Sequence, residues 1–208
     1  MKVSLIPYII LILMGAAWGL SIPLTKITVS TGYGQFGLIF WQFVIAVIVL
    51  GFVLIVRRKR PLFERKTIFL FIVLALLGTI CPNSASYVAT YYLPASFIAI
   101  LIATVPMFSF PIAMLMGLEK KDFRRISGLF IGLIGVVILT GPEASFPDRH
   151  LLIFIPLALL APFFYAIEGN YVDKYGTAGQ DPIQTFTGAS ILGTFLILPV
   201  TILSLIHI

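Results

Sequence analysis

Charged residues are scarce in this sequence. They occupy 11% of its 208 positions, whereas soluble domains carry about 25% to keep their surfaces hydrated. Hydrophobic residues make up 60% of the chain, and the mean hydropathy is +1.09. No soluble fold has enough interior to bury this much apolar surface. The composition therefore excludes a soluble domain and favours a protein whose solvent is the lipid bilayer.

Cysteine and histidine are almost absent, with one cysteine, Cys81, and two histidines, His150 and His207. A single cysteine excludes an internal disulfide, and two histidines give no ligand cluster of recognisable metal-site spacing. The sequence also lacks the HExxH, GxSxG and Walker signatures, and no paired carboxylates could position a nucleophile. We therefore expect no metal, no cofactor and no enzymatic activity.

Basic residues outnumber acidic ones by 14 to 8, which gives a net charge of +6. In a soluble protein this balance would suggest nucleic acid, but here the basic residues form short clusters between long apolar runs. That arrangement is typical of membrane topology and not of a nucleic-acid groove. We expect membrane lipid and a small-molecule substrate as partners, no nucleic acid, and possible homo-oligomers.

Long apolar runs fill most of the chain. A transmembrane helix needs roughly 20 apolar residues to cross about 30 Å of hydrocarbon. The first run shows no clean small-x-small cleavage site, which favours a span over a signal peptide. The pattern predicts an all-α integral membrane bundle of about seven transmembrane helices. The expected spans are residues 6–29, 38–56, 67–90, 95–118, 126–140, 151–172 and 183 onward.

The uncharged stretch 67–118 is too long for one crossing at 1.5 Å per residue. We expect a break at residues 91–94 (YYLP), because the residue before a proline leaves the helical region and paired tyrosines favour the membrane interface. Three further prolines lie within the two resulting spans and should kink them. These prolines are Pro82, Pro106 and Pro111.

The basic residues also predict an orientation. Alternating the loops places most of them on one side of the membrane, with Arg149 opposite and Lys26 at the far end of the first span. By the positive-inside rule, the basic side and the N-terminus are cytoplasmic, in a multi-pass protein of the plasma membrane. The basic side carries Lys2, Arg57, Arg58, Lys59, Arg60, Arg65, Lys66, Lys120, Lys121, Arg124, Arg125 and Lys174.

Two segments carry motifs of a known family. Residues 18–26 (WGLSIPLTK) contain a Trp-Gly pair followed later by a lysine. Residues 87–139 contain a Pro-Ala-Ser entry after tyrosines, a mid-helix proline, Glu119 at the end of the fourth span and a glycine-rich fifth span. Both segments resemble the EamA-type transporters of the drug/metabolite transporter (DMT) superfamily.

The resemblance implies ten helices in two inverted five-helix repeats. Residues 6–140 correspond to one complete repeat and residues 151–208 to an incomplete second one. The last six residues, 203–208 (LSLIHI), match what one reading frame of a common transposon-based sequencing adaptor encodes. We therefore expect the natural protein to continue beyond this point and these residues to be an assembly artefact.

The resemblance also implies a function, namely a secondary transporter, expected to be an exporter, of a small metabolite such as an amino acid or a related compound. Inverted repeats commonly frame a binding site near the bilayer midplane, and proline-kinked helices suit alternating access. Two alternatives stay open at this stage. They are a non-transporting membrane scaffold and a membrane-embedded enzyme.

Two charged residues inside spans are candidates for coupling or charge pairing, because a buried charge in hydrocarbon costs at least a few kcal/mol. Glu168 lies about one turn from the cytoplasmic end of its span, where it could pair with a cationic substrate group or carry a coupling proton. The alternatives for Glu168 are snorkelling and a hydrogen bond to Asn170. For Lys26 the favoured interpretation is snorkelling, since its long stem can reach water.

Polar residues in the third span predict a substrate-facing stripe. Asn83, Tyr87 and Tyr91 are spaced at i, i+4 and i+8 and thus share one helix face, although simple interhelical contacts are an equal alternative. Residues of other spans could line the same cavity. The expected substrate-binding set is Trp18, Ser21, Gln42, Asn83, Tyr87, Tyr91, Glu168 and Asn170.

Overall fold

The computed structural model describes residues 5–140 and 149–206, and within those ranges every regular element is a helix. Six segments are long and apolar enough to cross a membrane, and α7 adds a further apolar helix. The predicted all-α membrane architecture is confirmed. The elements are α1 (Ile6–Ser30), α2 (Gln35–Val56), α3 (Arg65–Ala75), the π-helix η1 (Leu76–Ile80), α4 (Cys81–Tyr92), α5 (Ala95–Ile102), α6 (Val105–Leu115), α7 (Phe123–Thr140), the 3₁₀-helix η2 (Arg149–Ile153), α8 (Phe154–Tyr175) and α9 (Pro182–Ile206).

The expected break in the long uncharged stretch is confirmed. Helix α4 ends at Tyr92, and α5 begins at Ala95. Between them, Leu93 and Pro94 have extended backbones with ψ values of 150° and 146°. The segment α3–η1–α4 thus forms one crossing and α5–α6 the next.

Prolines mark irregularities in both of these crossings. Pro82 follows η1 directly, and its ring would clash with the carbonyl four residues earlier, that of Gly78, in a regular α-helix. The wider π-turn at η1 relieves this contact. Pro106 lies at the start of α6, just after the helix is interrupted between Ile102 and Val105. Pro111, by contrast, lies inside α6 without ending it.

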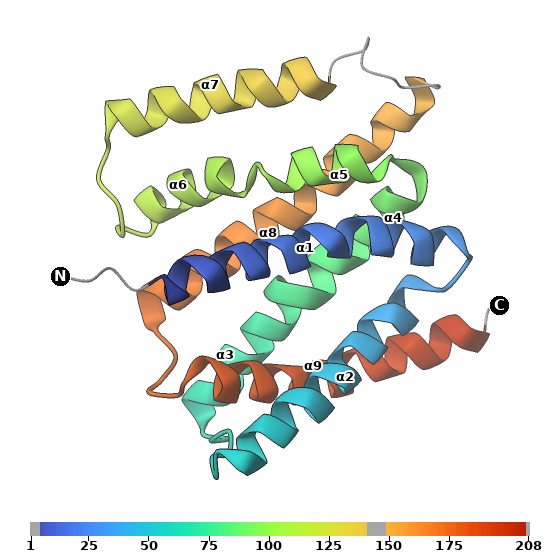
Figure 1. Cartoon of the computed structure of the whole chain (residues 1–208), viewed down its shortest axis with the longest axis vertical. Helices are drawn as coiled ribbons and strands as arrows, with labels where there is room; N and C mark the ends of the chain where they lie inside the picture. Colours follow the sequence, from blue (N-terminus) through green and yellow to red (C-terminus); the bar gives the residue numbers. More distant parts are fainter. Residues whose placement is uncertain (1–4, 141–148, 207–208) are drawn as a thin grey trace.

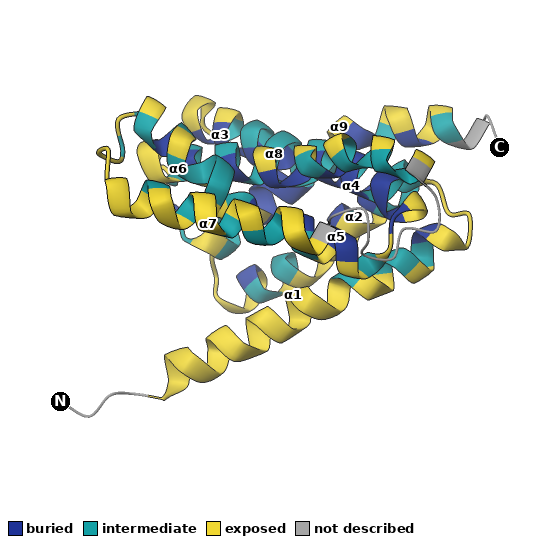
Figure 2. Ribbon diagram, turned by 90° about the horizontal axis from the view of Figure 1, so that it is seen from above, coloured by how far each residue is buried: buried dark blue, intermediate teal, exposed yellow. Residues whose placement is uncertain are grey.

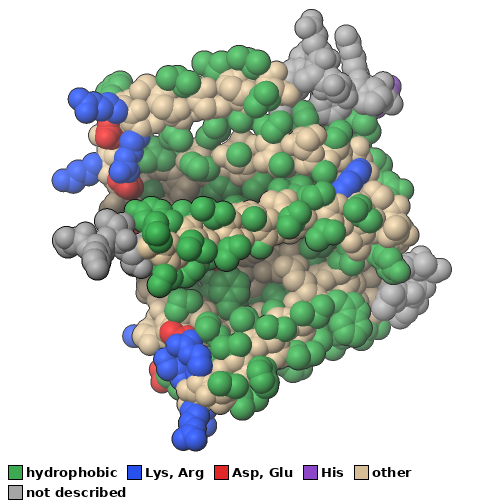
Figure 3. All heavy atoms as spheres, in the orientation of Figure 1, with side chains coloured by type: hydrophobic (Ala, Val, Ile, Leu, Met, Phe, Trp, Pro, Cys, Tyr) green, Lys and Arg blue, Asp and Glu red, His purple; other side chains and the backbone are tan. Residues whose placement is uncertain are grey.

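The helices run back and forth along one common direction (Figure 1). The α2–α3, α6–α7 and α8–α9 connections lie at one end, here named the basic end, and the α1–α2 and α4–α5 connections lie at the other. Lysine and arginine side chains gather at the basic end (Figure 3), while Lys26, near the end of α1, bonds the last turn of α4 at the opposite end. The helices therefore alternate in direction as the loop charges predicted.

Helices α8 and α9 join the earlier helices at the centre of the bundle. Helix α8 packs against α4 and α6, and α9 packs against α2 and α3. Two glycines of α9 allow it to lie close to α2 and α3. A Cβ at Gly188 would lie 2.3 Å from the Phe71 ring, and one at Gly193 would lie 2.4 Å from the Phe43 ring. Small residues allow this approach, and in lipid such close packing drives helix association.

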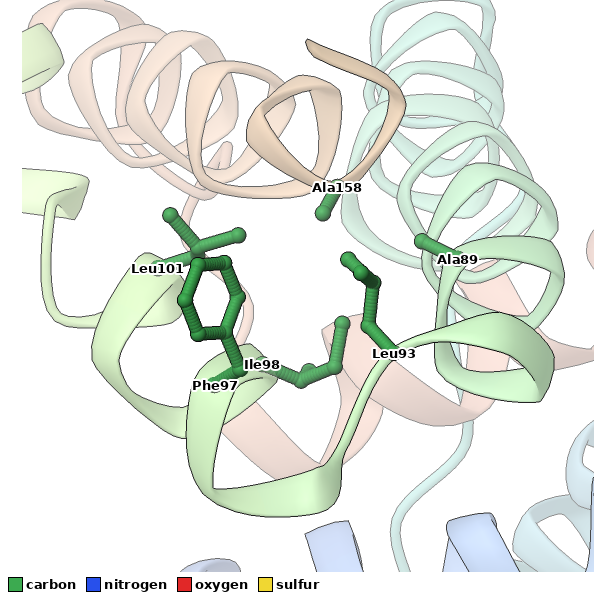
Figure 4. Packing of buried hydrophobic residues seen from close by; sticks show 6 residues of the cluster. All are labelled: Ala89, Leu93, Phe97, Ile98, Leu101 and Ala158. Carbon is green, nitrogen blue, oxygen red and sulfur yellow. The ribbon is translucent and has the colours of Figure 1, made fainter. Parts of the chain in front are cut away.

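An apolar cluster packs the turn between α4 and α5 against α8. Its larger side chains point toward two alanines, one on α4 and one on α8, so that the backbones approach closely (Figure 4). The cluster consists of Ala89, Leu93, Phe97, Ile98, Leu101 and Ala158.

Helix α1 is the most exposed of the long helices, and Val29 is its one buried residue (Figure 2). Its N-terminal half stands away from the rest of the bundle. Its surface is almost entirely apolar, with Leu11, Ile12 and Leu20 all more than half exposed. Such a surface is stable in hydrocarbon, where the helix satisfies its own backbone hydrogen bonds.

Candidate functional site

Two cavities meet at the centre of the bundle. The first, of about 290 Å³, lies between α1, α2, α4, α5 and α8, and we name it the Asn83 cavity. The second, of about 240 Å³, lies between α2, α3, η1, α8 and α9, and we name it the Glu168 cavity. Gln42, Gly78 and Tyr165 line both of them. These three residues therefore form the boundary between the cavities.

A hydrogen-bonded network crosses this boundary and joins three helices. Asn83 Nδ2 donates to Gln42 Oε1 at 2.9 Å, and the Tyr87 hydroxyl donates to the same oxygen at 3.2 Å. The Tyr165 hydroxyl donates to Asn83 Oδ1 at 3.1 Å. Gln42 Oε1 accepts both of these bonds, and its amide nitrogen has no acceptor among the described residues.

Thr90 adds an unpaired hydroxyl to the Asn83 cavity. The residue is only 1% exposed, and its Oγ1 has no hydrogen-bond partner among the residues that the structure describes. Buried polar atoms are normally paired, so an orphan that lines a cavity points to a ligand or water as the missing partner. Ser84 carries a similar unpaired hydroxyl, but it lines neither cavity.

The Glu168 carboxylate lies against the π-helix. A Cβ built on Gly78 would be 2.7 Å from Glu168 Oε1, so the carboxylate occupies space that only a glycine leaves open. Among the described residues, Glu168 forms neither a hydrogen bond nor an ion pair. An unpaired carboxylate inside a membrane span is costly and is typical of ion or substrate pathways.

Most of the predicted substrate-binding residues come together. Trp18, Ser21, Gln42, Asn83 and Tyr87 all line the Asn83 cavity. The contribution of Ser21 is limited, because its hydroxyl already donates to the Trp18 carbonyl at 2.6 Å. The structure thus brings five of the eight predicted residues to one cavity.

Glu168 lines the neighbouring cavity, and two predicted residues lie outside both. Tyr91 is 52% exposed and packs edge-on against Tyr92. Asn170 is buried and ties α8 to α6 through bonds to the Ser109 carbonyl and hydroxyl at 3.1 and 2.9 Å. The hydrogen bond considered between Glu168 and Asn170 is not formed.

Lys26 contacts the end of a helix and lines neither cavity. Its Nζ donates to the carbonyls of Thr90 and Tyr91, at 2.8 and 2.9 Å, in the last turn of α4. Carbonyls at a helix C-terminus carry partial negative charge and are stabilised by a cation. The ammonium group is thereby held by protein oxygens and ties α1 to α4.

Tyr165 lines the cavities but was absent from the predicted substrate-binding set. It precedes Glu168 by three positions on α8, so the two side chains share one helix face, and it lines both cavities. That spacing is the signal that could have identified it. Gly78 was missed as well, because its role depends on the carboxylate that α8 places against it.

These features define a multi-pass, all-helical membrane protein with an internal polar site. Residues 5–141, well over half of the chain, match the EamA-like transporter family. The chain therefore belongs to this family, and the resemblance of residues 18–26 and 87–139 is confirmed. Members of the family are membrane transporters of small molecules and not enzymes. No curated protein and no solved structure matches the chain.

Proposed function

We propose that this protein is a secondary transporter that exports a small polar or amphipathic metabolite, such as an amino acid or a related compound, across the plasma membrane. One observation carries the proposal: two neighbouring cavities share Gln42, Gly78 and Tyr165, and hydrogen bonds join Gln42 and Tyr165 to Asn83 at this boundary. A substrate that exchanges its own hydrogen bonds with this network could pass from one cavity to the other.

The two cavities offer complementary chemistry for a zwitterion. The amide nitrogen of Gln42 and the hydroxyl of Thr90 can donate to a substrate carboxylate, while the Glu168 carboxylate can pair with an ammonium group or carry the coupling proton. Trp18 and Ser21 line the side that α1 provides. We assign no substrate contact to Tyr91 or Asn170, since both lie outside the cavities.

The arrangement of the helices supports the proposed transport cycle. We infer that residues 151–208 begin a second repeat and that the basic end, with the N-terminus, faces the cytoplasm. Helix α8 would then meet α4 at the interface between repeats, which is where transporters of this kind place their sites. Rocking of one repeat against the other would open the cavities alternately.

Transport of an amino-acid mixture into or out of proteoliposomes that contain the purified protein tests this proposal. We expect flux above that of empty vesicles, and we expect Glu168→Gln to reduce it at least tenfold and to flatten its pH dependence. Asp173→Asn is the matched control, because Asp173 lies on the same helix and is exposed. Absence of flux for every candidate would contradict the function, and unchanged flux in Glu168→Gln would remove that residue from the mechanism.

A further inference from the structure

A groove separate from both cavities opens between α3 and the end of α8 at the basic end. Its volume is about 720 Å³, and none of its lining residues lines the Asn83 or the Glu168 cavity. Helix α3 contributes Ile68, Phe69 and Ile72, and α8 contributes Tyr171 and Tyr175. The groove is therefore apolar and aromatic along its length and is not part of the proposed transport site.

The packing of α3 explains why these side chains remain available. Phe71 and Leu74 are buried in a cluster with Ala189 of α9, and Leu70 belongs to the same cluster while it also lines the groove. The opposite face of α3 presents Phe69, which is 59% exposed and contacts the Tyr171 ring at a centroid distance of 6.3 Å. Large apolar surface of this kind at a membrane protein's rim is suited to an acyl chain.

Two cations stand at the polar end of the groove. Arg65 and Lys66 line it and are exposed, and neither forms an ion pair with any described residue. Their acidic neighbour Glu64 caps α3 and does not line the groove. Nearby Arg57 and Lys59 differ, because both contact Asp181. The charged residues that line the groove are thus both cations, and they lie at one end of it.

We propose that this groove binds an anionic phospholipid of the leaflet at the basic end. Arg65 and Lys66 hold the phosphate, Tyr171 and Tyr175 lie at the level of the headgroup, and an acyl chain follows Ile68, Phe69 and Ile72. From Arg65 to Ile72 the helix rises about 10 Å, which carries the groove from the headgroup region into hydrocarbon. Basic pockets between transmembrane helices bind anionic headgroups in this way.

The experiment compares thermal unfolding of the purified full chain in neutral detergent, with phosphatidylglycerol, phosphatidylcholine or inorganic phosphate added. Phosphatidylglycerol at about 100 times its dissociation constant should raise the Tm by about 5–10 °C, and the other two should not. The shift should vanish in Arg65→Gln/Lys66→Gln. It should persist in Lys120→Gln/Lys121→Gln, which removes equal charge from the α6–α7 connection.

A second variant tests the acyl chain without changing charge. Ile72→Trp fills the apolar part of the groove and should lose most of the phosphatidylglycerol shift while it retains both cations. The proposal is overturned if Ile72→Trp or the Arg65/Lys66 variant responds like the unmodified protein. It is also overturned if inorganic phosphate alone gives the full shift, which would indicate a site for a soluble anion. Transport activity does not enter this test, so its outcome is independent of the proposed function.

Discussion

Gly78 is the residue that makes the Glu168 site possible. It belongs to both cavities, lies in the π-turn of η1, and leaves the space that the Glu168 carboxylate fills. π-Turns are frequent at functional sites because the extra residue re-aims neighbouring groups. Here the wider turn and the missing side chain act together on one carboxylate.

Replacing Gly78 with alanine should impair transport more than stability. The new Cβ would lie 2.7 Å from Glu168 Oε1 and 2.9 Å from its Cδ. Since the carboxylate ends a flexible side chain, it should move aside and leave the helices in place. Alanine also favours a helix by about 0.8–1 kcal/mol relative to glycine. We expect an unchanged or higher Tm together with a transport rate reduced at least fivefold.

Gly51→Ala provides the control for that substitution, because nothing lies within 4 Å of a Cβ at Gly51 on α2. Its transport rate should match that of the unmodified protein. Equal rates in Gly78→Ala and Gly51→Ala would show that the position of the Glu168 carboxylate is unimportant.

At the level of elements, the end of α4 accounts for the position of the Lys26 ammonium group. The favoured sequence interpretation has its ammonium group snorkelling toward water, and in the structure this group bonds the Thr90 and Tyr91 carbonyls where α4 ends. Lys26→Met should therefore lower stability by about 0.5–2 kcal/mol, seen as a lower Tm. Lys26→Arg should restore most of the loss. If Lys26 instead carried a coupling charge, Lys26→Met would keep its Tm and lose the pH dependence of transport.

The ends of the helices could be predicted from the sequence because their signals are local. Pro94 after paired tyrosines predicted the α4–α5 break, and the charge clusters predicted the α2–α3 and α6–α7 connections. The π-turn before Pro82 was predicted only as a kink, since its form depends on Gly78 and on α8 packing against it.

The residues that line the Asn83 cavity were predicted only in part, because they too depend on how the helices pack. The polar residues of α4 identify one helix face, but which of them meet other helices depends on long-range packing. Tyr87 contacts Gln42, whereas Tyr91, one turn further on, packs against Tyr92 at the surface. Tyr165 enters the network because α8 crosses α4 beside Asn83. Nothing in the local sequence sets that crossing.

At the scale of the whole molecule, a polar latch joins the α2–α3 connection to the α8–α9 connection at the basic end. Asp181 accepts from Lys59 Nζ at 2.8 Å, Leu62 N donates to Gln180 Oε1 at 2.9 Å, and Gln184 Nε2 donates to the Arg60 carbonyl at 2.7 Å. If residues 151–208 begin the second repeat, this latch links the two repeats. These bonds would then be formed when the basic end is closed and broken when it is open.

The Asp181 part of the latch should respond to acid in a defined direction. The hydrogen bond from Lys59, a backbone hydrogen bond from Gln184 and the charges of Lys59 and Arg57 lower the pKa of the Asp181 carboxyl below its ordinary value of 3.8. A carboxyl with a lowered pKa stabilises the folded state above that ordinary value, and its contribution is lost as pH falls through the lowered one. The latch should thus be intact throughout the neutral range.

Asp181→Asn tests this by comparing Tm values across pH. At pH 7 the variant should unfold at a lower temperature than the unmodified protein, with the gap reduced at high salt because the paired side chains are partly exposed. At a pH below the lowered pKa of Asp181 the gap should close, since the unmodified protein has then lost the same charge. Glu119→Gln, which breaks the Glu119–Arg125 pair between residues six positions apart, removes a surface ion pair without unlinking the two halves. A loss of Tm in Glu119→Gln equal to that in Asp181→Asn would mean that the latch contributes no more to stability than an ordinary surface ion pair.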